Sequence, residues 1–330
     1  MIQYYQIEEN GITEGNKDHY NWLVLTSDTE KKTQEICRKY HLPADVFVDT
    51  DFSEGVTKVE KLEKTRLSNP LSIVLLHLKR QESFKENRIE PLSFILSDEL
   101  MITYLAKDSP VIDELISSLE TSVYSFEKLL TNFIFLSYQQ FITSARQLEK
   151  DIEQINKEAQ KTTENQTLVH LSETEQTLIL LYHALHDQEE SLNVLWHDKK
   201  FRDKINDPAL IYDTQQAQKQ ALKLVNVYRD MILSISSLFN SLIDNNLNHI
   251  MEYLETLGLL LSVPALIGSI WGMNTGVPGE KNHLAFWLVL GIALIFTILL
   301  AFFLQRKNIT NKKDLRTNKR KALQYYFSLQ

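Results

Sequence analysis

Two long stretches near the C-terminal end of the chain contain no charged residue. The first runs from Thr256 to Gly279 and the second from Asn282 to Gln305, 24 residues each. About 20 consecutive apolar residues form a helix that spans the ~30 Å hydrocarbon core of a bilayer. A core helix of a soluble protein is rarely apolar on every face over such a length. The pattern therefore predicts two transmembrane helices.

The first 108 residues show short apolar runs separated by polar turns, which is typical of β-strands. These runs are Trp22–Leu25, Leu71–Leu78, Leu92–Leu96 and Leu100–Leu105. Between the first two, the capping residues Ser27–Glu30 predict a helix that ends near Lys39. The pattern predicts an α/β domain.

Helical periodicity replaces the strand pattern after Pro110. Residues 158–165 interrupt it, and Ser172-Glu173-Thr174-Glu175 predicts a new helix start. After Pro208 and as far as Met273 there is one proline, Pro264, and no glycine before Gly258. These residues predict one helix of more than sixty residues, roughly 90–100 Å long. Because so long a helix needs partners along its length, we expect an oligomer.

Basic residues identify the inner side of the membrane, because they are enriched in cytoplasmic segments. The link between the two spans contains Lys281 alone, whereas eight basic residues follow the second span. They are Arg306, Lys307, Lys312, Lys313, Arg316, Lys319, Arg320 and Lys321. We therefore expect an integral protein of the plasma (inner) membrane with both termini in the cytoplasm.

The expected organisation has six parts. They are a cytoplasmic α/β domain (1–108), a cytoplasmic helical segment (109–206), a long stalk helix (207–273) whose first transmembrane span covers about 254–273, an external loop (274–282), a second span (283–305) and a basic cytoplasmic tail (306–330).

Composition excludes several classes of function. The net charge of -8 disfavours a nucleic-acid partner, which would require a basic surface. A single cysteine, Cys37, permits neither an intramolecular disulfide nor a multi-cysteine metal site. The chain also has no nucleophile motif, phosphate-binding loop or nucleotide fingerprint. We expect no enzyme activity, including no ATPase activity.

Polar residues recur every seven positions along the first span. Asn248, Glu255, Ser262 and Ser269 form this series, and it is flanked by Met251, Gly258, Ala265 and Gly272. Polar side chains at membrane depth are costly unless they face protein or water. Small and hydroxyl residues also allow membrane helices to pack closely. We favour a pore wall built from several copies of this helix, because Asn248 and Glu255 are larger than close packing requires.

The segment Ile270-Trp271-Gly272-Met273-Asn274 ends an apolar helix, and a second span follows it within ten residues. In this setting it resembles the CorA family of magnesium transporters, of the Gly-Met-Asn type. The upstream stretch from Tyr228 to Met251 is similar to the stalk of that family, with matching spacing, and Lys58-Val59-Glu60 is similar to its cytoplasmic domain. The resemblance covers nearly the whole chain.

This resemblance implies a funnel-shaped homopentamer that is surrounded by membrane lipid, admits Mg²⁺ through a central pore and is gated by cytoplasmic Mg²⁺. It implies an outer selectivity filter of Gly272, Met273 and Asn274. Hydrated Mg²⁺ suits neutral amide and carbonyl oxygens, which hold the ion through its waters without trapping it. The expected pore lining is Asn248, Met251, Glu255, Gly258, Ser262, Ala265 and Ser269.

Two residues depart from the pattern of the family. The acidic residue expected shortly after the motif is Glu280, six positions later and beside Lys281. Glu255 occupies a position that is often hydroxylic in the family, and a pentamer would carry up to five such carboxylates in a ring. Crowded carboxylates disfavour shared ionisation, so some of the five are expected to be protonated.

The candidate ligands for regulatory Mg²⁺ are carboxylates of the cytoplasmic part, Asp45, Asp49, Asp207 and Asp213. The alternative for each is an ordinary solvated surface charge.

Other functions stay open at this point. A proton-coupled zinc transporter of the ZntB type shares the Gly-Met-Asn context, so Zn²⁺, Co²⁺ or Ni²⁺ are alternative substrates. A membrane-anchored scaffold or signalling protein is a more remote alternative, and the polar series in the first span argues against it.

Overall fold

The structure is a computed structural model that describes residues 2–8, 11–43, 45–47, 57–78, 89–107, 109–119, 125–159, 165–273, 284, 286–304 and 306. Its contacts divide the chain into two compact units, Met1–Phe239 and Asn240–Gln330.

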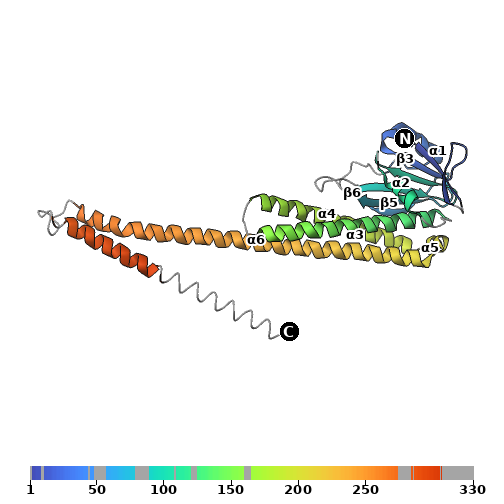
Figure 1. The fold of residues 1–330 in the computed structure, drawn as a ribbon. Coiled ribbons are helices and arrows are strands. Elements are labelled where there is room, and N and C mark those ends of the chain that lie inside the picture. The colour runs from blue at the N-terminus through green and yellow to red at the C-terminus, as the bar shows by residue number, and fades with distance from the viewer. Residues whose placement is uncertain are drawn as a thin grey trace, which may run out of the picture. The chain divides into compact units, whose positions relative to one another are not determined.

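The N-terminal unit begins with a seven-stranded sheet (Figure 1). Its strands are β1 (Ile2–Glu8), β2 (Gly11–Glu14), β3 (Trp22–Thr26), β4 (Lys58–Lys61), β5 (Leu71–Leu78), β6 (Ile89–Leu96) and β7 (Met101–Leu105), in the order β2-β1-β3-β7-β6-β5-β4. β3 and β7 are parallel, and the other neighbours are antiparallel. The four apolar runs identified in the sequence became β3, β5, β6 and β7, which confirms the α/β domain.

The centre of the sheet is buried on both faces, which explains why its strands are continuously apolar rather than alternating. Leu23 and Leu25 on β3 face a cluster with Ile95 and Ile102, and α1 (Glu30–Tyr40) contributes Ile36 to it. On β3 the buried Trp22 donates its indole N–H to Thr103 Oγ1 on β7 at 2.9 Å.

Helices complete the N-terminal unit. They are α2 (Val111–Ser118), α3 (Phe126–Ala159), α4 (Asn165–His197), α5 (Lys199–Ile205) and the first part of α6 (Pro208–Trp271), and a short 3-10 helix, Ser27–Thr29, precedes α1. The helix start predicted at Ser172–Glu175 is wrong, since α4 begins at Asn165 and continues through it. The Thr174 hydroxyl donates to the His170 carbonyl at 2.8 Å, a bond that such side chains make in helix interiors.

The predicted helix of more than sixty residues is confirmed, because α6 contains 64. Within the N-terminal unit it lies beside α3 and α4 (Figure 1). The Tyr228 hydroxyl donates to Glu149 on α3, and the Trp196 indole on α4 donates to Gln218. The buried residues follow helical spacing: Thr214, Ala217, Gln218, Ala221, Val225, Tyr228, Ile232, Ile235 and Phe239.

The joint between α5 and α6 is two residues long. Asn206 closes α5 with a left-handed backbone, φ 51°, a conformation that asparagine adopts more readily than most residues. Asp207 then accepts the Leu210 N–H at 3.0 Å and caps the start of α6.

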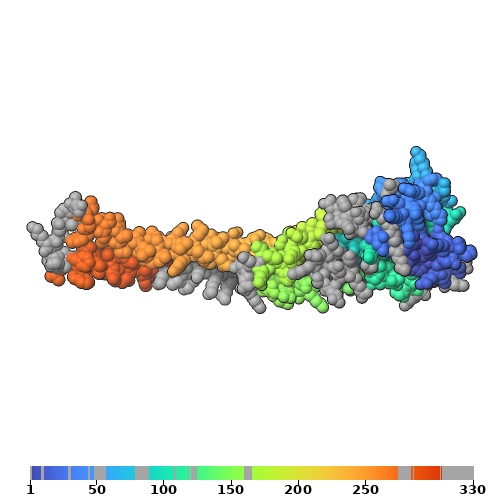
Figure 2. Space-filling view, turned by 90° about the horizontal axis from the view of Figure 1, so that it is seen from above, coloured from blue at the N-terminus to red at the C-terminus, as the bar shows by residue number. Residues whose placement is uncertain are grey.

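The C-terminal unit contains the rest of α6 and a second apolar helix, Phe286–Leu304. Figures 1 and 2 show this second helix, in red, beside the end of α6. Both helices are long and apolar enough to cross a membrane, and almost none of the most apolar part of each is buried. Such exposure suits lipid rather than water.

Replacing Ile232 tests the packing of α6. Ile232 is fully buried, so Ile232→Ala should lower the free energy of unfolding by about 2–5 kcal/mol through the cavity it leaves. The neighbouring Leu233 is 45% exposed, and Leu233→Ala should cost within about 0.5 kcal/mol. Denaturant unfolding of the full-length protein measures both values, and equal losses would contradict this packing.

Candidate functional site

The candidate pore residues lie on the last part of α6, and all seven are exposed in the single chain. They are Asn248, Met251, Glu255, Gly258, Ser262, Ala265 and Ser269. The Ser262 hydroxyl donates to the Leu259 carbonyl at 2.8 Å, which satisfies its hydrogen and leaves its oxygen able to accept.

A different face of α6 is partly covered in the C-terminal unit. Its members are Thr256, Leu260, Val263, Ile267 and Trp271, which follow helical spacing. On the second apolar helix Ala293 is buried, and Thr297, four residues further on, is partly covered. Since the two helices lie side by side, we infer that these two faces meet (Figure 1).

The candidate pore series and the covered face point in nearly opposite directions. At 100° per residue, their mean directions around the helix axis differ by about 150°. The second apolar helix therefore leaves Glu255, Ser262 and Ser269 uncovered. Polar groups at this depth require protein or water as a neighbour, which a single chain does not provide for them.

The end of α6 falls at the Gly-Met-Asn segment. The Gly272 N–H donates to the Gly268 carbonyl at 2.9 Å, and the Met273 N–H reaches the Ile270 carbonyl at 3.5 Å. The regular helix ends at Trp271, and Met273 is exposed. Asn274 and Glu280 lie outside the described residues, so their roles stay predictions.

Asp207 has a structural partner on each side. Its carboxylate caps α6 and forms an ion pair with Lys128 Nζ at 3.1 Å. The Leu210 N–H, and then Lys128, hold the pKa of Asp207 below its usual value. Its proposed role as a ligand for regulatory Mg²⁺ competes with these contacts.

The remaining candidates for regulation are Asp45, Asp49 and Asp213. Asp45 and Asp213 are exposed, and Asp49 lies outside the described residues. In the part of the chain that the structure describes, no group of three or more His, Cys, Asp or Glu side chains is placed to hold a metal ion. A regulatory site made by these residues therefore stays a prediction.

Residues 17–307 match the family model described as CorA-like Mg²⁺ transporter protein. The chain belongs to this family. It is 21% identical over 310 residues to the magnesium transport protein CorA of Helicobacter pylori, and the match covers 92% of each chain. This CorA family member is accordingly a divalent-cation transporter of the membrane and not an enzyme.

Two solved structures have a similar fold. One is the complete CorA magnesium transporter from Methanocaldococcus jannaschii, with a TM-score of 0.71, 18% identity, and coverage of 92% of this chain and 96% of that chain. The other is the full-length CmaX protein, with a TM-score of 0.67, 13% identity, and coverage of 92% and 97%. The CorA fold predicted from the sequence is confirmed, with its α/β domain, long helix and C-terminal apolar helix.

The face of α6 that meets the second apolar helix was not predicted. The sequence does carry a signal for it, because Leu260, Val263 and Ile267 are bulky apolar residues at helical spacing. Leu259 and Leu266 are also bulky apolar residues at helical spacing, yet they are exposed. Apolar spacing in a membrane helix therefore does not distinguish a lipid-facing side from one that contacts a helix.

Alanine at Gly272 should disturb the end of α6. A Cβ atom there would lie 3.1 Å from the Gly268 carbonyl oxygen, so the backbone must shift just before Asn274. We expect Gly272→Ala to reduce cation uptake about tenfold, equivalent to about 1.4 kcal/mol. Gly268→Ala is the control, since nothing outside the backbone of its own helix turn lies within 4 Å of an added Cβ. Equal uptake by the two variants would contradict this interpretation.

Proposed function

We propose that the protein is a homopentameric channel that carries hydrated Mg²⁺ into the cytoplasm across the plasma (inner) membrane. The observation that carries this proposal is the exposed polar series on α6, opposite the face that meets the second apolar helix. Copies of α6 around a central axis would turn Glu255, Ser262 and Ser269 toward water and leave the second apolar helix outside. Two helices from one chain enclose no such path.

The outer filter in this proposal consists of Gly272, Met273 and Asn274. α6 ends here, so backbone carbonyls of its last turn lack the donors of a continuing helix and are available as acceptors. Carbonyl and amide oxygens hold Mg²⁺ through its tightly bound waters. The membrane potential drives entry, supplying about 2.3 kcal/mol per charge per 100 mV.

The direction of transport and the gating follow from the same proposal. The basic tail beyond residue 306 belongs on the cytoplasmic side by the positive-inside rule. Cytoplasmic Mg²⁺ bound by carboxylates between subunits would keep the pore closed until its concentration falls. Asp213 and Asp45 are the exposed candidates for such ligands.

Uptake into liposomes tests the choice of cation. The purified protein should admit Mg²⁺ down its gradient without a proton gradient, and Co²⁺ and Ni²⁺ should compete. Zn²⁺ uptake that requires a proton gradient would instead identify a zinc transporter, and no flux at all would favour the scaffold. Asn274→Ala should abolish selectivity for Mg²⁺ while the oligomer stays intact by light scattering, and unchanged selectivity would remove the filter role of Asn274.

Glu255 should concentrate cations at the inner mouth. It lies 17 residues before Gly272, about 25 Å along a helix, near the inner end of the hydrocarbon. A ring of carboxylates raises the local cation concentration about tenfold or more, so Glu255→Gln should reduce Mg²⁺ uptake by that factor at low Mg²⁺.

Glu252→Gln is the matched control for this change. Glu252 lies about 90° around the helix from the candidate pore series and contacts His249 at 3.7 Å. Glu252→Gln should leave Mg²⁺ uptake unchanged, and a similar loss of uptake in both variants would indicate a general surface-charge effect.

A further inference from the structure

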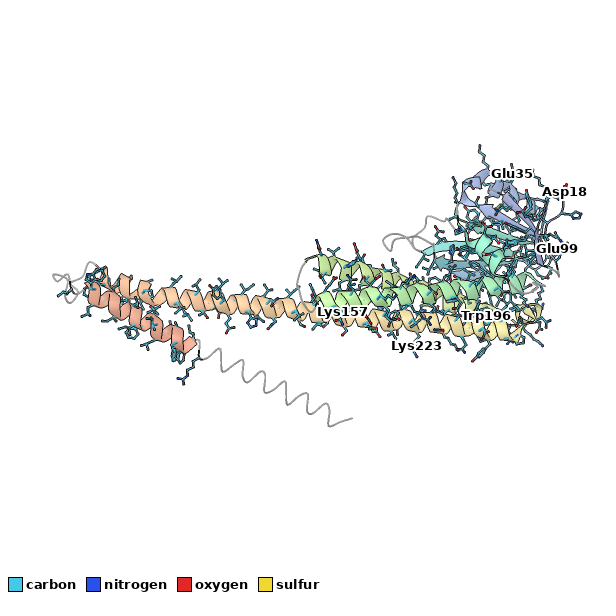
Figure 3. The ribbon with its side chains drawn as sticks, in the orientation of Figure 1. Asp18, Glu35, Glu99, Lys157, Trp196 and Lys223 are labelled. Carbon is cyan, nitrogen blue, oxygen red and sulfur yellow. The ribbon has the colours of Figure 1, made fainter. Side chains whose placement is uncertain are left out.

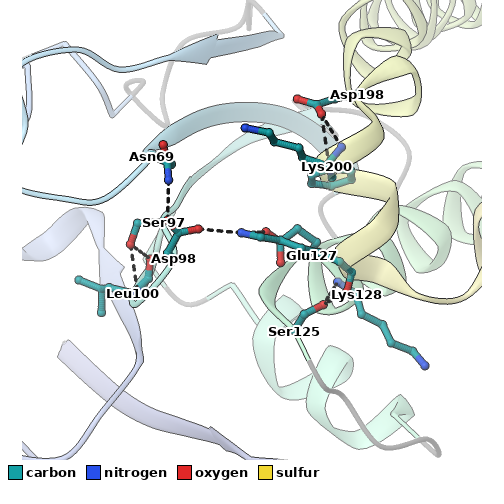
Figure 4. Close-up of polar contacts among 11 residues, drawn as sticks. Asn69, Ser97, Asp98, Leu100, Ser125, Glu127, Lys128, Asp198 and Lys200 are labelled. Atoms are coloured by element: carbon teal, nitrogen blue, oxygen red, sulfur yellow. Dashed lines mark hydrogen bonds and ion pairs between the residues drawn. The ribbon is translucent and has the colours of Figure 1, made fainter.

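Three elements of the N-terminal unit meet at the ammonium group of Lys204. This group lies 2.8 Å from Asp98 Oδ1 and 3.0 Å from Glu127 Oε1. Asp98 belongs to the turn between β6 and β7, Glu127 to the first turn of α3, and Lys204 to the last turn of α5. One side chain thus links the sheet to two helices, and Figure 4 labels the two carboxylates that it contacts, Asp98 and Glu127.

Both carboxylate-bearing segments are held by further contacts. Asn69 donates its amide to Asp98 Oδ2 at 2.6 Å, and the Asp98 N–H donates to the Ser68 carbonyl at 3.1 Å. The Ser125 hydroxyl, just before α3, donates to the Lys204 carbonyl at 2.8 Å. The two carboxylates are therefore positioned to face one cation.

The two carboxylates differ in their access to water. The side chain of Glu127 is only 10% exposed, whereas Asp98 is 38% exposed and Lys204 46%. A buried carboxylate is costly without a positive partner. The neighbouring Lys128 forms an ion pair with Asp207 at 3.1 Å. The Lys204 ammonium also keeps the pKa of Asp98 below its usual value.

This arrangement has the ligand chemistry of a divalent-cation bridge. Mg²⁺ in proteins commonly binds one or two carboxylates and completes its octahedral shell with water. Here two carboxylates from distant parts of the chain converge within 3.0 Å of one point, and the site is open to water on one side. The Lys204 ammonium group occupies the position between the two carboxylates where such a cation would bind.

We propose that Lys204 is a built-in counterion that takes the place of a bridging divalent cation and holds the sheet on α3 and α5 at any Mg²⁺ concentration. The contact of the turn between β6 and β7 with α3 and α5 then persists when the cytoplasmic Mg²⁺ concentration falls. Without the lysine, the same two carboxylates would repel each other and would bind Mg²⁺ instead. The inference is independent of which cation the protein carries.

Lys204→Met tests this inference, since methionine has a similar length and no charge. The full-length variant in detergent should melt several degrees below wild type without divalent cations. Millimolar Mg²⁺ should then raise its melting temperature by more than it raises that of wild type. Adding Asp98→Asn should abolish the extra rise, and Lys204→Arg should resemble wild type.

Lys157→Met is the matched control. Lys157 lies near the other end of α3 and forms an ion pair with Glu153 at 3.6 Å (Figure 3). This variant should show no extra response to Mg²⁺. An equal response in the Lys204 and Lys157 variants, or an extra rise that survives Asp98→Asn, would overturn the proposal.

A measurement on the wild-type protein tests the inference even if Lys204→Met does not fold. Amide hydrogen exchange at Ser97, Asp98 and Glu99 should be the same with and without Mg²⁺, because Lys204 already holds this turn. Slower exchange of the turn in Mg²⁺ would show that a divalent cation, and not the lysine, stabilises this contact, and would overturn the proposal.

Discussion

The helical backbone of α6, which continues through Pro264 although proline has no N–H to donate, is the constraint on which the rest of the structure depends. A helix satisfies its own N–H and C=O groups, so the same element serves among protein side chains and in hydrocarbon. Up to Phe239 the helix buries a stripe that includes Ala221 and Ile232. Beyond Phe239 the side chains of α6 are largely unburied in the single chain, and their chemistry determines which face contacts protein, lipid or water.

Much of this architecture was predictable because composition determines it. Charge-free stretches identify membrane helices, and the continuously apolar Leu71–Leu78 identifies a buried strand. β1 was missed because Gln3, Tyr4 and Gln6 dilute its apolar pattern, and β4 because Lys58 and Glu60 do so at the sheet edge. α4 was divided wrongly at Thr174, because capping residues also occur inside helices when they bond to their own backbone.

The candidate site was predictable only in part. Spacing of seven placed Glu255, Ser262 and Ser269 on one line, but the sequence did not show which face of α6 meets the second apolar helix. The role of an acidic residue is even harder to predict. Asp207 caps a helix and Asp213 is an exposed charge, but no sequence pattern distinguishes the two. Asp98 and Lys204 are separated by 106 positions, so no local pattern indicates that they meet.

The two-residue joint between α5 and α6 has a mechanical consequence. Asn206 and Asp207 offer few backbone torsions to absorb a twist, and both are already committed to closing one helix and opening the next. Rotation of α6 about its own axis would therefore act on α5 through this joint, and through Lys204 on the turn between β6 and β7, in addition to its effect on α3 and α4 through their contacts with α6. The sheet would then move together with the N-terminal end of α6.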